Sequence, residues 1–173
     1  MATVYATFDS PLGDLLLVGS AGPGGPALTR LAVDARPQPE WRRDQDAFAD
    51  AGHQLRAYFA GERRAFDLPY AASGTAFQRR VWLAVDAIPY GRTATYGALA
   101  ERVGAPRDRI RAVAAAVGAN PLLILRPCHR VVGADGKLTG YAAGLERKRY
   151  LLNLEGGTML GSMGVELFLT SNP

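Results

Sequence analysis

The side chains best suited to chemistry in this 173-residue chain are its single cysteine, Cys128, and the histidine that follows it, His129. A thiol attacks an electrophile as its thiolate, and a free pKa near ~8.5 leaves only a small thiolate fraction at neutral pH. A neighbouring base or positive charge must therefore activate Cys128. His129 is adjacent, but neighbours on an extended strand point to opposite faces. The imidazole would then act only around a turn or through a water.

His129 would itself need a partner that holds its ring and stabilises the imidazolium, and a carboxylate from elsewhere in the chain suits that role. Glu155, at the end of a predicted helix, is the candidate. On these residues alone two other interpretations stay open. Cys128 and His129 would be ordinary core residues, and Glu155 would be a solvated charge at a helix end.

Composition narrows the classes of protein that fit. Hydrophobic residues make up 48% of the chain, and no apolar run approaches the ~20 residues of a membrane helix. Residues 1–5 lack the basic and apolar regions of a signal peptide. One cysteine cannot form an internal disulfide and, with two histidines, does not make a closed structural zinc site. We therefore expect a cytoplasmic protein with no membrane partner and no metal.

Positive charge is concentrated in the part of the chain that holds Cys128. Residues 1–74 carry 7 Lys and Arg against 9 Asp and Glu, whereas residues 75–155 carry 13 against 6. The formal net charge of the whole chain is +4. A basic segment of this kind is typical of proteins that bind polyanions such as nucleic acids.

The first part of the chain is expected to form a small domain that supports the site. Alternating apolar residues predict strands at 4–8, 15–18 and 28–33, with a candidate edge strand at 66–68. Helical spacing predicts a helix at 44–60, and the small residues of 69–74 mark a boundary. The predicted organisation is an N-terminal domain at 1–70, a linker at 71–75, a C-terminal domain at 76–156 and a tail at 157–173.

The C-terminal domain is predicted to be mostly helical, with helices at 75–87, 96–103, 107–119 and 145–154. Thr95 is the expected N-cap of the second helix and Gly104 its expected stop. Two helices joined by a short glycine-containing turn form either a helix-turn-helix or an ordinary αα-corner. The predicted class is therefore α+β, a sheet-plus-helix domain followed by a helical domain with a winged helix-turn-helix.

The helix at 107–119 has arginines at its start and only small side chains afterwards. Arg107, Arg109 and Arg111 lie where a recognition helix meets DNA, while residues 112–119 are only Ala, Val and Gly. Such a helix has few donors or acceptors with which to read bases in the major groove. Small residues instead allow a close approach to the duplex, where phosphate contacts and deformability dominate. This pattern indicates a protein that searches DNA without reading its sequence.

Together these motifs resemble the O6-alkylguanine-DNA alkyltransferase family. The strings that carry the resemblance are Asn120-Pro121, Pro127-Cys128-His129-Arg130-Val131, Gly140-Tyr141, the closing helix with Glu155, and the earlier segments Phe77 to Trp82, Ile88 to Gly91 and Thr95 to Gly97. The similarity extends from about Thr3 to Gly156 and is strong after residue 76. It implies a largely structural N-terminal domain and a C-terminal domain that binds DNA and carries out the chemistry.

The activity that the resemblance implies is direct-reversal DNA repair. An alkyl group would pass irreversibly from O6-alkylguanine in double-stranded DNA to Cys128 after the nucleotide is flipped out of the stack. A thioether has no easy route to hydrolysis, so each molecule would react once, as a suicide enzyme. No cofactor is implied. The expected form is a monomer, and cooperative binding along DNA, activity on O4-alkylthymine and the accepted alkyl sizes stay open.

The resemblance implies three groups of site residues. The catalytic group is Cys128, His129 acting through a water, Glu155, Asn120 and Tyr96. The DNA-binding group is Arg111, Tyr96, Arg109, Ala112, Ala115 and Arg130. The pocket group is Tyr141, Val131, Ala142 and Ala143. Asn120 would brace the turn before the active-site segment, and Tyr96 would rotate a phosphate. Arg111 would enter the base stack, with Arg109 as the alternative.

One segment and two positions depart from the family pattern. The segment Arg107 to Ile110 is one residue longer than in some relatives, which is why Arg109 stays an alternative to Arg111. Arg126 stands where an aliphatic residue is usual, so its charge must reach solvent or a partner. Ala143 replaces a glycine, and its methyl is expected to crowd large alkyl groups in the pocket. Three other functions remain to be weighed against repair: a sequence-specific regulator, a relative that binds damage without transfer, and a Cys-His hydrolase.

Overall fold

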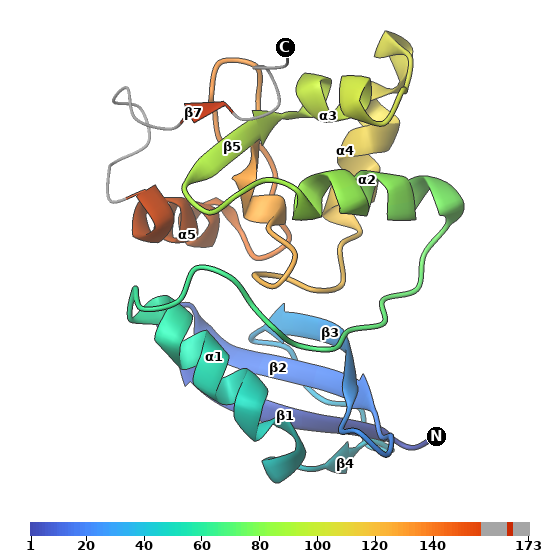
Figure 1. The fold of residues 1–173 in the computed structure, drawn as a ribbon, viewed down its shortest axis with the longest axis vertical. Helices are drawn as coiled ribbons and strands as arrows, with labels where there is room; N and C mark the ends of the chain where they lie inside the picture. Colours follow the sequence, from blue (N-terminus) through green and yellow to red (C-terminus); the bar gives the residue numbers. More distant parts are fainter. Residues whose placement is uncertain (157–165, 168–173) are drawn as a thin grey trace. The chain divides into compact units, whose positions relative to one another are not determined.

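The computed structural model describes residues 1–156 and 166–167, and its class is α+β, as predicted (Figure 1). The chain divides into two compact units. The first contains Met1–Ser73 and Pro121–Leu125, and the second contains Gly74–Asn120 and the residues from Arg126 onward. The predicted boundaries differ from this division, because Pro121–Leu125 lies inside the predicted C-terminal domain. The predicted tail lies outside the described residues, apart from residues 166–167.

The first unit is a four-stranded sheet with a helix beside it (Figure 1). Its strands, in the order β3-β2-β1-β4, are β1 (Thr3–Ser10), β2 (Gly13–Ser20), β3 (Ala27–Val33) and β4 (Arg42–Arg43). The first three are antiparallel, and β4 runs parallel to β1. A 3-10 turn, η1 (Asp46–Phe48), leads into α1 (Ala49–Phe59). Gly52 allows α1 a close approach, since a Cβ atom there would lie 2.4 Å from the ring of Phe8.

The first unit differs from the prediction in two places. The helix expected at 44–60 begins only after β4 and η1. The prediction of an edge strand at 66–68 is wrong. The side-chain amide of Gln54 donates to the carbonyl of Asp67 at 2.9 Å and accepts from its backbone N–H at 2.8 Å, so these groups do not pair with a neighbouring strand. The backbone of Leu28 instead pairs with residues 69–71.

Pro121–Leu125 joins the first unit through the edge of β3. The backbone N–H of Leu31 donates to the carbonyl of Pro121 at 2.9 Å, and Leu123 donates to the carbonyl of Leu31 at 3.3 Å. Leu122 and Ile124 are buried. The segment thus satisfies part of the open edge of β3, which would otherwise present unpaired backbone groups.

The second unit contains four helices and a small parallel sheet among its described residues. The helices are α2 (Ala76–Asp86), α3 (Tyr96–Arg102), α4 (Ile110–Gly118) and α5 (Leu145–Gly156). The strands, in the order β6-β5-β7, are β5 (Arg92–Thr95), β6 (Val131–Val132) and β7 (Glu166–Leu167). No helix in the described part of the chain is long and apolar enough to cross a membrane.

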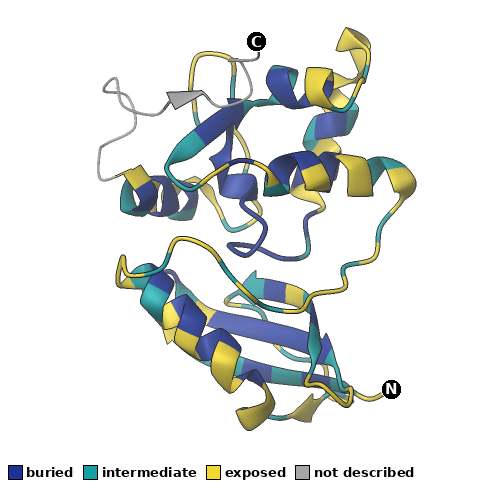
Figure 2. Cartoon of the chain, in the orientation of Figure 1, coloured by how far each residue is buried: buried dark blue, intermediate teal, exposed yellow. Residues whose placement is uncertain are grey.

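The helix pair α3–α4 has the predicted boundaries at its turn. The Thr95 side chain accepts a hydrogen bond from the backbone N–H of Ala98 at 3.0 Å, and Gly104, at φ +70°, ends α3. The helix predicted at 107–119 is divided into a 3-10 turn, η2 (Arg107–Arg109), and α4. Figure 2 shows α4 buried on one side and exposed on the other. Its buried residues are Val113, Ala116 and Val117.

Candidate active site

The segment that carries the thiol is a tight turn and not an extended strand. Ile124 has a φ of +71°, and η3 (Cys128–Arg130) is a 3-10 turn closed by a bond from the backbone N–H of Arg130 to the carbonyl of Pro127 at 2.9 Å. The turn changes the relation between Cys128 and His129, because their side chains no longer alternate as on a strand. Cys128 is 4% exposed and His129 is 0% exposed.

Asn120 contacts the sulfur directly. Its side-chain Nδ2 lies 3.1 Å from the Cys128 Sγ and 3.1 Å from the carbonyl oxygen of Arg126. The sequence predicted Asn120 as a brace for the turn, and the second contact agrees with that position. The first contact was not predicted. It places an amide donor where negative charge would develop on a thiolate.

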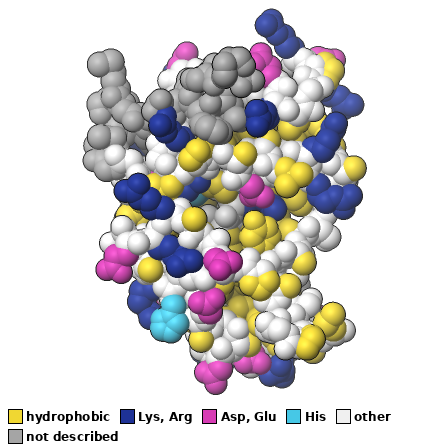
Figure 3. Space-filling view, viewed as in Figure 1, with side chains coloured by type: hydrophobic (Ala, Val, Ile, Leu, Met, Phe, Trp, Pro, Cys, Tyr) yellow, Lys and Arg dark blue, Asp and Glu magenta, His cyan; other side chains and the backbone are white. Residues whose placement is uncertain are grey.

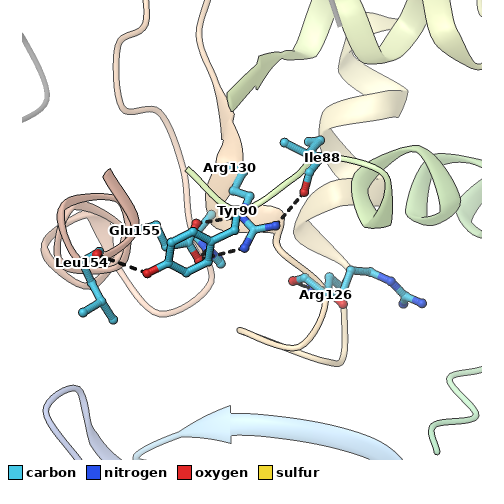
Figure 4. Close-up of polar contacts among 8 residues, drawn as sticks. Ile88, Tyr90, Arg126, Arg130, Leu154 and Glu155 are labelled. Atoms are coloured by element: carbon cyan, nitrogen blue, oxygen red, sulfur yellow. Dashed lines mark hydrogen bonds and ion pairs between the residues drawn. The ribbon is translucent and has the colours of Figure 1, made fainter. Parts of the chain in front are cut away.

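Glu155 lies against Arg130, as Figure 4 shows, and also against His129. Its Oε2 is 2.8 Å from the His129 Nε2, and its Oε1 is 2.7 Å from the Arg130 Nε. Burial alone would raise the pKa of Glu155, but the charge and hydrogen bond of His129, together with Arg130, hold that pKa well below its usual range. The carboxylate therefore fixes one ring nitrogen of His129. The other nitrogen, Nδ1, is buried and has no hydrogen-bond partner among the described protein atoms.

The protonation states in the site follow from burial. Burial raises the pKa of the Cys128 thiol, while the Asn120 hydrogen bond and the positive charge of Lys148 act in the opposite direction. The resting side chain is thus a thiol that needs a base. Burial raises the pKa of Tyr141 well above its usual value, and the negative charges of Glu155 and of Cys128 as a thiolate act in the same direction, so its hydroxyl remains a donor. That hydroxyl is buried and has no partner among the described protein atoms.

A mainly apolar pocket of about 440 Å³ has Cys128 in its wall. Its walls come from the start of α3, one face of α4 and the loop before α5. The lining residues are Tyr96, Ile110, Arg111, Ala114, Val117, Gly118, Cys128, Thr139, Gly140, Tyr141 and Ala142. The volume is within the range of small-molecule sites. The pocket brings the predicted residues Tyr96, Arg111, Tyr141 and Ala142 together with the thiol.

Lys148 is fully buried on α5 and was not predicted from the sequence as a site residue. Its Nζ donates to the carbonyls of Thr139 at 3.3 Å and Gly140 at 3.1 Å, both in the pocket wall. Burial lowers the pKa of Lys148 to about 8, and the negative charge of Cys128 partly opposes that effect. The residue lies one helical turn before Leu152 in a helix with many charged residues, so nothing in the local pattern separates it from the exposed Arg149.

Two predicted positions, Arg130 and Ala143, are corrected by the structure. Arg130 was expected to contact DNA, but it is 7% exposed, and its guanidinium is bonded to Glu155 and to the carbonyl of Ile88 at 2.6 Å (Figure 4). Ala143 was expected in the pocket, but it does not line it, and its carbonyl accepts a hydrogen bond from Arg147 at 3.1 Å. The side chain of Val131 is fully buried in β6, and the role expected for the backbone around it stays a prediction.

The other residues predicted to contact DNA lie on accessible parts of η2 and α4. Arg107, Arg109, Arg111 and Ala115 are exposed, and Ala112 is half-buried. Lys and Arg side chains are visible around the turn that joins α3 to α4 in Figure 3. Of the two arginines proposed to enter the base stack, Arg111 lines the pocket and Arg109 does not.

The charge of Arg126 reaches a partner rather than solvent. Its Nε lies 3.1 Å from Oδ1 of Asp86, and its Cζ lies 4.8 Å from the centroid of the Trp82 ring. Burial raises the pKa of Asp86, and Arg126 opposes that rise.

Among the described residues, no group of three or more His, Cys, Asp or Glu side chains is arranged to hold a metal ion.

The pairing of a helix-turn-helix with a buried thiol in the wall of an adjoining pocket defines a class of DNA-binding protein with a cysteine nucleophile. Residues 76–157 match the family model described as 6-O-methylguanine DNA methyltransferase, DNA binding domain. Residues 3–72 match the model described as the ribonuclease-like domain of the same methyltransferase. The chain therefore belongs to the 6-O-methylguanine DNA methyltransferase family.

Individual relatives are similar over most of their length. A methylated-DNA–protein-cysteine methyltransferase of Mycolicibacterium paratuberculosis is 52% identical over 155 residues, which cover 87% of this chain and 91% of the relative. The crystal structure of Mycobacterium tuberculosis O6-methylguanine methyltransferase is 49% identical, with a TM-score of 0.80, and the match covers 88% of this chain and 92% of the other. A structure of Mycobacterium tuberculosis OGT in complex with DNA has the same coverage and TM-score at 50% identity.

Proposed function

We propose that this protein repairs DNA by transferring the alkyl group of O6-alkylguanine to Cys128, once per molecule. The observation that carries the proposal is that the buried Cys128 lines a pocket whose walls include the helix α4. A sequence-specific regulator would not need this thiol, and a relative that only binds damage would lack it. The names of the relatives support the same activity.

The proposed reaction begins with removal of the thiol proton. His129, held at Nε2 by Glu155, is the base, and its Nδ1 would receive the proton through a bound water, since a buried imidazole nitrogen needs a partner. The Asn120 amide stabilises the thiolate as it forms. Sγ then attacks the alkyl carbon, an S–C bond forms, and the C–O6 bond breaks with its electron pair left on guanine. The hydroxyl of Tyr141, or that of Tyr96, which also lines the pocket, is expected to supply a proton to the departing guanine.

The target nucleotide must leave the duplex for this step, because the alkyl carbon is inaccessible inside the stack. Arg111 lies at the pocket and on the exposed face of α4, so it is suited to occupy the space left in the stack. Unstacking costs a few kcal/mol and least for a damaged base, which favours lesions over normal guanine. The small residues Ala112 and Ala115 allow α4 to approach the duplex closely.

The proposed partner is double-stranded DNA that carries O6-alkylguanine, bound by a monomer, and cooperative binding along the DNA is consistent with this form. A single reactive cysteine also fits a reducing compartment, so we place the protein in the cytoplasm.

The test is incubation of the protein with a duplex that contains one O6-methylguanine, followed by mass spectrometry of the intact protein and its peptides. We expect one methyl group per protein, on the peptide that contains Cys128, and repair that stops at about one lesion per molecule. Cys128→Ala should bind the duplex but acquire no methyl group. Sustained turnover, or a methyl group on another residue, would refute the proposal.

A further inference from the structure

We propose that Arg126 is a positioning residue for Cys128: its contacts with Asp86 and Trp82 fix the backbone carbonyl that orients Asn120 toward the thiol. The inference rests on the proposed alkyl transfer, since it concerns the reactivity of the nucleophile in that reaction. It assigns a role to a position at which the family resemblance leads one to expect an aliphatic side chain.

The Arg126 side chain is anchored by its contacts with α2. The residue is 7% exposed, and the pair with Asp86 has an Nε–Oδ1 distance of 3.1 Å. The guanidinium lies over the ring of Trp82 at 4.8 Å, within the range of a cation–π contact. A buried charge is costly unless it is paired, so these contacts hold the side chain against α2. In Figure 4 the side chain points away from the Glu155–Arg130 pair, which leaves that pair separate.

The backbone of Arg126 is connected to the sulfur. Its carbonyl accepts hydrogen bonds from the backbone N–H of Cys128 at 2.8 Å and from Nδ2 of Asn120 at 3.1 Å. The same Nδ2 is 3.1 Å from Sγ. One amide nitrogen is therefore shared between the carbonyl and the thiol. A displacement of the carbonyl changes the geometry of the donor at the sulfur.

Trp82 links the anchor to the pocket wall. Its Nε1 donates to the carbonyl of Ala116 on α4 at 2.8 Å, and the next two residues, Val117 and Gly118, line the pocket. The contacts of Arg126 thus tie the thiol turn to the same helix that shapes the pocket.

Two mechanisms by which Arg126 acts on Cys128 differ in the sign of a measurable effect. The positive charge of Arg126 by itself lowers the pKa of the thiol, against the larger effect of burial. If charge alone mattered, Asp86→Asn would remove a negative charge and lower the thiol pKa. If anchoring matters, Asp86→Asn loosens the guanidinium and the Asn120 donor with it, so the thiol pKa rises. Arg126→Met raises the pKa under either mechanism.

The experiment measures the rate of Cys128 alkylation by iodoacetamide against pH in both variants. This reagent needs neither DNA nor a flipped base. We expect both variants to show a higher thiol pKa and a rate at pH 7 that falls about three- to tenfold, the loss of thiolate for a rise of roughly 0.5–1 unit. Reaction with free O6-benzylguanine should slow by a similar factor.

The pair of exposed Arg42 and half-buried Asp44, at 3.0 Å in the first unit, provides controls for the loss of an ion pair away from the thiol. Arg42→Met and Asp44→Asn should leave the thiol titration unchanged. An unchanged or lowered thiol pKa in Asp86→Asn would overturn the proposal, and this holds even if Arg126→Met does not fold. The wild-type thiol reacts with iodoacetamide whether or not it accepts an alkyl group from DNA. A wild-type protein that transfers nothing from DNA would therefore refute the proposed function and leave this test intact.

Discussion

The side-chain amide of Asn120 lies 3.1 Å from the sulfur of Cys128, so the residue before the thiol segment supports both the turn and the nucleophile. The hydrogen bond opposes the rise in thiol pKa that burial causes. It does so most effectively when the thiolate forms, because hydrogen bonds to a charged acceptor are stronger than neutral ones. The reactivity of Cys128 therefore depends on a donor outside the Cys-His pair.

The first prediction concerns that donor. Asn120→Asp has nearly the same shape but replaces the amide with a carboxylate, so it should raise the thiol pKa more than Asn120→Ala does. Both variants should react more slowly with free O6-benzylguanine at neutral pH. The rate of reaction with iodoacetamide against pH gives the thiol pKa of the wild type and of the two variants. If Asn120→Asp titrates like the wild type, the contact has no effect on the nucleophile.

The second prediction concerns stability and pH. The pKa of Glu155 is depressed in the folded protein, so its stabilisation is present above the unfolded pKa of ~4.3 and is lost as the pH falls below that value. Glu155→Gln leaves the buried Arg130 without a charged partner and should lower the free energy of unfolding by about 3–5 kcal/mol at pH 7. The difference from the wild type should shrink below about pH 4.

Urea denaturation at several pH values measures this difference. Glu146→Gln, an exposed acid on the same helix, is the control and should change the free energy by less than about 0.5 kcal/mol. A difference for Glu155→Gln that is independent of pH would mean that the loss comes from packing rather than from the ion pair.

The third prediction concerns Lys148. Lys148→Met removes a positive charge near Cys128 and the donor to the carbonyls of Thr139 and Gly140. We expect a higher thiol pKa and, in addition, weaker saturation by free O6-benzylguanine, because the pocket wall loses a support. Arg149→Met, at the exposed neighbouring position, should behave as the wild type. A normal thiol titration together with normal saturation would show that Lys148 serves packing alone.

The fourth prediction separates flipping from chemistry. Arg111→Ala should slow repair of duplex DNA by at least tenfold, a barrier change of about 1.4 kcal/mol. The same variant should affect the reaction with a free base much less, since that reaction needs no flipping. Arg109→Ala should affect both reactions less, because Arg109 does not reach the pocket. A larger selective loss at Arg109 would assign the role to that residue.

The fifth prediction concerns the size of the alkyl group. Ala143 does not line the pocket, so Ala143→Gly should leave the rates for methyl and benzyl substrates nearly unchanged. Ala114 does line it, and Ala114→Leu should slow reaction with a benzyl substrate, with an overpacking cost of roughly 1–3 kcal/mol, more than with a methyl substrate.

Ala115→Leu is the matched control for the pocket on the next position of α4. Ala115 is exposed and outside the pocket, so the reaction with free bases should not change. A benzyl rate that rises in Ala143→Gly would restore the interpretation that its methyl occupies the pocket.

The amino-acid sequence by itself determined the features that depend on neighbours along the chain. The helix caps at Thr95 and Gly104 could be predicted from their residue types. A threonine side chain accepts a hydrogen bond at a helix start, and a glycine adopts the left-handed φ at a helix end. The strands β1, β2 and β3 and the helices α3 and α4 follow from short-range periodicity. The string around Cys128 identified the family, because a short sequence with unusual residues is recognisable without a structure.

Tertiary structure alone decided which distant side chains meet. Periodicity says which face of a helix is buried but not what that face contacts. Glu155 and His129 are 26 residues apart, and Asp86 and Arg126 are 40 apart. Arg130 turned inward because a buried carboxylate pairs with a cation, and Lys148 was buried because two carbonyls accept from it. Such partners are chosen by the folded geometry, since the desolvation of a charge is compensated only where its counterpart is already held in place.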